Sequence, residues 1–87
     1  MDNQHFKQFC QLLLNDVQAG KIKRQTAAYQ IAGRMFDEKL LANKDIEEVV
    51  MLAGTLELPY HQATQEGSVE AYEKEWQSLL TKINNLE

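Results

Sequence analysis

The chain has 87 residues, of which 44% are hydrophobic and 25% are charged, which is ordinary for one globular domain. Its net charge of −4 is unevenly divided: residues 1–44 carry seven Lys/Arg and four Asp/Glu, and residues 45–87 carry two Lys/Arg and nine Asp/Glu. A single cysteine excludes a disulfide framework, and no apolar run is long enough to span a membrane.

We expect one domain over residues 1–87, located in the cytoplasm and bacterial in style. The first residues lack the basic start and apolar core of a signal peptide, and Cys10 lies in an apolar stretch, which suits a reducing compartment. We interpret Leu86 and Glu87 as residues that cloning could have added ahead of a tag that was later removed.

The first predicted helix spans residues 3–19. Leu12 and Leu14 widen its apolar stripe, and Gly20 is a natural left-handed stop. The stripe itself recurs at helical spacing: Phe6, Phe9, Cys10, Leu13 and Val17.

The second predicted helix spans residues 24–42. Its apolar stripe consists of Ala28, Ile31, Ala32, Met35 and Phe36, closed by Leu40 or Leu41. Ala28, Ala32 and Gly33 make one side of this helix small, which predicts close approach of a neighbouring helix. Alternatively, these three residues form the interface of a homodimer, because small side chains let two helices approach closely.

The third predicted helix spans residues 46–58. Asp45 and Glu48 have the spacing of a capping box, with Asp45 at the N-cap position. Pro59 ends this helix, because the residue before a proline avoids the α region.

The fourth predicted helix spans residues 69–84, after a connection over residues 59–67. Ser68 is a suitable N-cap. The amphipathic stripe is the clearest in the chain and consists of Val69, Tyr72, Trp76, Leu79, Leu80 and Ile83.

These patterns predict an all-α fold, a single antiparallel bundle of four helices with short connections. No segment alternates with the period of a strand, and no hairpin turn signal is present in the sequence. A three-helix core with one peripheral helix is the alternative.

The sequence contains no recognisable catalytic arrangement. Cys10 is the candidate nucleophile, but His5 lies about 140° from it around one helix, so the two do not meet there. Glu57 and His61 are four residues apart, as metal ligands on a helix would be, but Pro59 separates them. We therefore expect no catalytic residue, no metal site, no cofactor and no enzymatic activity.

Nucleic acid is not the expected partner. The basic cluster of Lys21, Lys23 and Arg24 is small in a chain of net charge −4. If the second and third helices formed a helix-turn-helix, the recognition helix would begin with Asp45, Glu47 and Glu48, which repel phosphate. A DNA-binding regulator remains an alternative, as does a homodimeric helical protein of another role.

The acidic second half favours a basic protein partner, because a negative surface steers and holds cationic proteins. The alternative is that the acid serves only solubility. The expected partner-binding residues lie at the end of the third helix, in the following connection and on the fourth helix: Glu57, Tyr60, His61, Glu66, Glu70 and Glu73.

The layout resembles that of the colicin D-type immunity proteins, a family of small acidic helical proteins that block a basic tRNA-cleaving toxin. The similarity covers most of the chain: an apolar first helix ending in Gln18-Ala19-Gly20-Lys21-Ile22, a long second helix, a third opening at Asp45, and an acidic stretch before a Leu-rich last helix. The resemblance implies that Glu57, Glu66, Glu70 and Glu73 mimic RNA phosphate in the cleft of a nuclease. The region between Pro59 and Gly67 departs from the family in holding one acidic residue, Glu66.

Overall fold

The computed structural model describes residues 2–56 and 69–86, and this part of the chain is all-helical, without strands. The predicted all-α class is confirmed, whereas a four-helix antiparallel bundle is not. The described elements are α1 (Asn3–Gln18), α2 (Arg24–Ala32), the 3₁₀ helix η1 (Gly33–Phe36), α3 (Glu38–Leu41), α4 (Lys44–Leu56) and α6 (Val69–Asn84).

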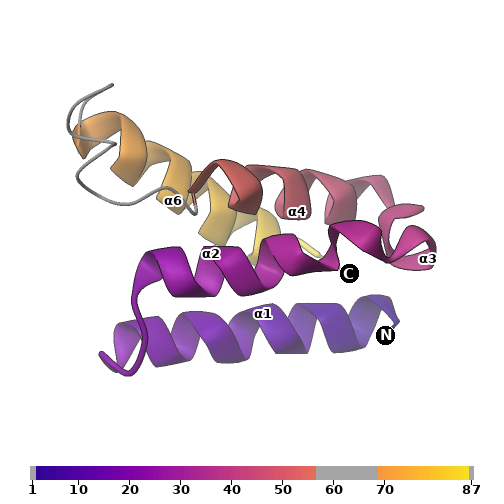
Figure 1. The fold of residues 1–87 in the computed structure, drawn as a ribbon, viewed down its shortest axis with the longest axis horizontal. Helices are drawn as coiled ribbons and strands as arrows, with labels where there is room; N and C mark the ends of the chain where they lie inside the picture. Colours follow the sequence, from indigo (N-terminus) through magenta and orange to yellow (C-terminus); the bar gives the residue numbers. More distant parts are fainter. Residues whose placement is uncertain (1, 57–68, 87) are drawn as a thin grey trace.

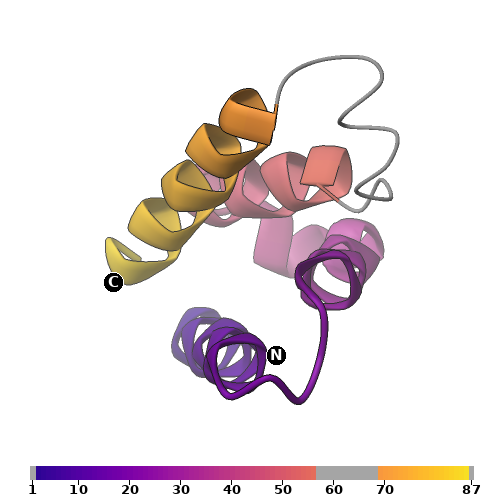
Figure 2. The same ribbon diagram turned by 90° about the vertical axis from the view of Figure 1, so that its left-hand side faces the viewer.

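Helices α1 and α2 run side by side in opposite directions, and α4 lies along the other side of α2 (Figure 1). Gly20 makes the turn between α1 and α2 with a φ of 77°, in the left-handed region that glycine adopts without steric cost. Seen nearly along α1 and α2, α6 is inclined across the other helices instead of aligning with them (Figure 2). It packs mainly on α4 and more sparsely on α1.

The prediction of one continuous helix over residues 24–42 is wrong, because the structure divides this segment into three helical elements. The α-helix ends at Ala32, a 3₁₀ turn follows, and Asp37 is extended at φ −89° and ψ 91°. Gly33 lowers helix propensity by up to about 1 kcal/mol, and the Asp37 carboxylate accepts a hydrogen bond of 3.1 Å from the Leu40 N–H. This capping bond starts α3 as a separate element.

The break in the helix turns two predicted core residues outward. Met35 is 48% exposed and Phe36 is 85% exposed. An α-helix advances about 100° per residue and a 3₁₀ helix about 120°, so each η1 residue is rotated further from the stripe of α2. Arg34 faces α1 instead, with its guanidinium carbon 4.7 Å from the centroid of the Phe9 ring.

Helix α4 begins two residues before the predicted start, because its cap is Asn43. The Asn43 Oδ1 accepts hydrogen bonds from the Asp45 N–H at 2.9 Å and the Ile46 N–H at 3.4 Å. The predicted capping box with Asp45 at N-cap is therefore wrong, and Asp45 lies in the first turn of the helix. The end predicted at residue 58 lies outside the described residues.

The core is apolar throughout the described residues, without a buried polar or charged side chain. Helices α1 and α6 keep their predicted bounds to within one residue, and α6 contributes Trp76 and two further residues, Leu79 and Ile83, to the core. Seventeen side chains form it: Phe6, Cys10, Leu13, Ala27, Ala28, Ile31, Ala32, Leu40, Ile46, Val49, Val50, Ala53, Leu56, Trp76, Leu79, Ile83 and Leu86.

Candidate functional site

Four of the predicted partner-binding residues, Glu57, Tyr60, His61 and Glu66, lie outside the described residues. The other two are on the first half of α6. Glu70 is exposed and forms no ion pair with any described residue, whereas Glu73 forms an ion pair with Arg24 at the start of α2.

The acidic side chains of α4 and α6 fall into two groups at opposite ends of this helix pair. Near the end of α6, the Lys82 ammonium lies 3.2 Å from the Glu48 carboxylate at the start of α4. At the other end, the Tyr72 hydroxyl donates a hydrogen bond of 3.4 Å to the Leu56 carbonyl. The two helices therefore run in opposite directions, which separates the acid at the start of α4 from Glu70 and its neighbours on α6.

The candidate dimer seam is not a surface of the protomer. Ala28 and Ala32 are buried in the core, where α2 packs against α4, so they are not available to a second chain. Gly33 is exposed, and a Cβ added there would meet nothing within 4 Å. Ala28 and Ala32 therefore pack against a neighbouring helix of the same chain, which was the first interpretation of this small side. Gly33 does not take part in a close helix contact.

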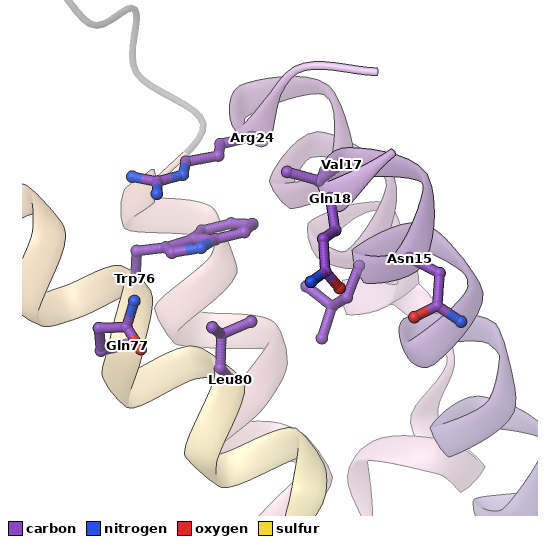
Figure 3. A pocket seen from close by; sticks show the side chains of 8 residues that line it. Asn15, Val17, Gln18, Arg24, Trp76, Gln77 and Leu80 are labelled. Atoms are coloured by element: carbon purple, nitrogen blue, oxygen red, sulfur yellow. The ribbon is translucent and has the colours of Figure 1, made fainter. Parts of the chain in front are cut away.

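A groove lies between α1 and α6, and we call it the α1–α6 groove. Trp76 and Leu80 of α6 face Val17 and Gln18 of α1 across it (Figure 3). This part of the groove has a volume of about 480 Å³, within the range of about 300–1,000 Å³ typical of small-molecule pockets. It is lined by Leu14, Asn15, Val17, Gln18, Arg24, Trp76, Gln77 and Leu80.

The groove continues toward the end of α6 as a second hollow of about 440 Å³. The two hollows share Leu14, Asn15, Gln18 and Leu80, and the second adds Gln11 and Asn84. The lining is therefore mixed, with apolar side chains of both helices set between amide side chains. Each amide presents donors and an acceptor, so these side chains can bind a polar ligand of either kind.

One end of the groove carries a stacked arginine. The Arg24 guanidinium carbon lies 5.3 Å from the centroid of the Trp76 ring and also pairs with Glu73. Trp76 is only 3% exposed, so this stack covers the ring instead of offering it to a ligand.

At the other end of the groove, Lys7 ties α1 to the C-terminus of α6. Its ammonium donates hydrogen bonds of 3.2 Å to the Asn84 carbonyl and 2.6 Å to the Leu86 carbonyl. Helix C-termini carry partial negative charge and unpaired carbonyls, so a lysine here both caps and closes the end.

Of the candidate catalytic groups, the structure describes Cys10 and His5, and it places Cys10 in the core and His5 on the exposed start of α1. Burial raises the pKa of the Cys10 thiol to about 12, which leaves it protonated and unreactive at neutral pH. The His5 ring lies 3.2 Å from Asp2 at the exposed start of α1, and its backbone N–H, bonded to the carboxylate, lowers the pKa of Asp2. Among residues 2–56 and 69–86, no three His, Cys, Asp or Glu side chains cluster as metal ligands would.

The patterns in the sequence do not predict the α1–α6 groove. The signal that could have indicated it is the repetition of amides beside the apolar stripes, at Gln11, Asn15 and Gln18 on one helix and Gln77 and Asn84 on the other. Residues three, four and seven apart share one face of a helix, so these amides follow the stripes along their edges. The pairing of α1 with α6 is a property of the tertiary fold.

No protein-family model, curated protein sequence or solved structure matches this chain. Within the part of the chain that the structure describes, no helix has the length and apolar character needed to cross a membrane.

Proposed function

We propose that this chain is a non-enzymatic, protein-binding module, and that carboxylates of α4 and α6 contact a basic partner. The observation that carries the proposal is the set of exposed carboxylates on these helices that form no ion pair with any described residue: Asp45, Glu47, Glu70 and Glu75. Unpaired surface carboxylates contribute little to the stability of the fold and are free to pair with a partner.

The buried, protonated Cys10 supports a binding role over a catalytic one. The α1–α6 groove supports it as well, because its lining offers apolar and amide contacts and a single ionisable side chain, Arg24. Such a surface can hold another macromolecule but lacks an evident acid, base or nucleophile.

The test is capture of partners from lysate of its own cells at low and high salt. We expect a basic protein whose capture falls steeply as salt rises, because exposed charge contacts are screened. Two charge-neutralised variants, Asp45→Asn/Glu47→Gln and Glu70→Gln/Glu75→Gln, separate the two acidic ends. We expect one of them to weaken capture roughly tenfold, since each exposed ion pair contributes up to about 1 kcal/mol.

The control is Asp16→Asn/Glu38→Gln, which removes the same charge from α1 and α3. Equal loss in the control would reduce the effect to net charge, and equal capture by all variants would contradict the proposal.

The narrower form of this function is neutralisation of a basic nuclease toxin, as the resemblance to immunity proteins implies. Its specific outcome in the same experiment is capture of a ribonuclease domain whose cleavage of tRNA this chain inhibits. A captured basic protein without nuclease activity would contradict the narrower form and leave the broader one standing.

A further inference from the structure

We draw no further inference here: the strongest candidate, the α1–α6 groove between Leu14 of α1 and Leu80 of α6, has a mixed polar and apolar lining, and nothing in the structure shows what covers it.

Discussion

Arg24 and Trp76 join the start of α2 to the middle of α6, with the guanidinium carbon 5.3 Å from the centroid of the indole ring. The same guanidinium pairs with Glu73, one turn before Trp76. One side chain therefore covers the tryptophan, links two helices that are distant in sequence and ends the α1–α6 groove (Figure 3).

Replacing this arginine should loosen α6. A cation–π contact at an accessible site contributes about 0.5–1 kcal/mol, and a half-exposed ion pair adds about 0–1 kcal/mol. We expect Arg24→Gln to lower the free energy of unfolding by about 1 kcal/mol and to alter tryptophan emission, as measured in guanidinium titrations. Lys21→Gln, a loss of charge in the exposed turn before α2, should change neither. Unaltered emission in Arg24→Gln would contradict the stack.

Because Asn43 caps α4, substitutions at Asn43 and at Asp45 should lower stability by different amounts. Loss of an N-cap side chain costs about 1 kcal/mol, so Asn43→Ala should lower the free energy of unfolding by that amount. Asp45→Ala removes one carboxylate from the first turn, and its cost should be about 0.5 kcal/mol through the helix dipole alone. Chemical denaturation of both variants decides the point, and the reverse order would restore Asp45 as the cap.

Two phenylalanines differ in burial, because the 3₁₀ turn leaves Phe36 on the surface. Phe6 is fully buried, whereas Phe36 is 85% exposed. Phe6→Ala should cost about 3–5 kcal/mol through loss of burial and a residual cavity. Phe36→Ala, the same chemical change on the surface, should stay within about 0.5 kcal/mol. Thermal and urea unfolding measure both, and a large cost for Phe36→Ala would favour the continuous helix over residues 24–42.

Local patterns in the sequence predicted the helices well where one face is covered continuously. Helices α1 and α6 each bury residues at helical spacing, and that spacing predicted their existence and their bounds. The predicted stripes are too wide, because Leu12 on α1 and Val69 at the start of α6 are exposed. The pattern was misleading after Ala32, because Met35 and Phe36 continue the α period in sequence while the backbone does not follow it. Two residues indicated a break in the helix: Gly33 is a weak helix former, and Asp37 is a residue type that caps the next helix.

The candidate site was less predictable, because it depends on which helices meet. Amide edges on α1 and α6 are visible in the sequence, but their position across one groove follows from the inclination of α6 in the fold. The contact between Arg24 and Trp76 joins residues 52 positions apart, beyond the reach of helical spacing. The acidic residues of α4 and α6 are visible in the sequence, but the fold places the described ones at two opposite ends of this helix pair.

The last described turn is part of the core. Leu86 is 4% exposed, and its carbonyl accepts the hydrogen bond from Lys7. Leu86→Ala should cost about 2 kcal/mol, the lower end of the range for a core leucine, because Leu86 lies beyond the end of α6 and backbone outside a helix can adjust to the cavity. Asn85→Ala, an exposed neighbour, is the control and should cost little. Denaturant titration of both checks the prediction, and an equally small loss in both would contradict the packing of Leu86.

The cysteine makes stability depend on pH in the alkaline range. Burial raises the pKa of the folded thiol to about 12. In the unfolded chain the pKa of a cysteine thiol is about 8.5. Between these values the folded chain keeps a proton that the unfolded chain has released. The contribution of Cys10 is therefore complete below the unfolded pKa and declines as pH rises toward the folded one.

We expect the unfolding free energy of the unmodified chain to fall more steeply above about pH 8.5 than that of Cys10→Ala. Burial also raises the pKa of Tyr72, which acts in the same direction, so the difference between the two proteins isolates the thiol. Alkylation by iodoacetamide should likewise be slow in the folded chain and fast in denaturant. Parallel pH profiles for the two proteins, or rapid alkylation of the folded chain, would show that the thiol is accessible and that the packing between α1 and its neighbours is looser than this core implies.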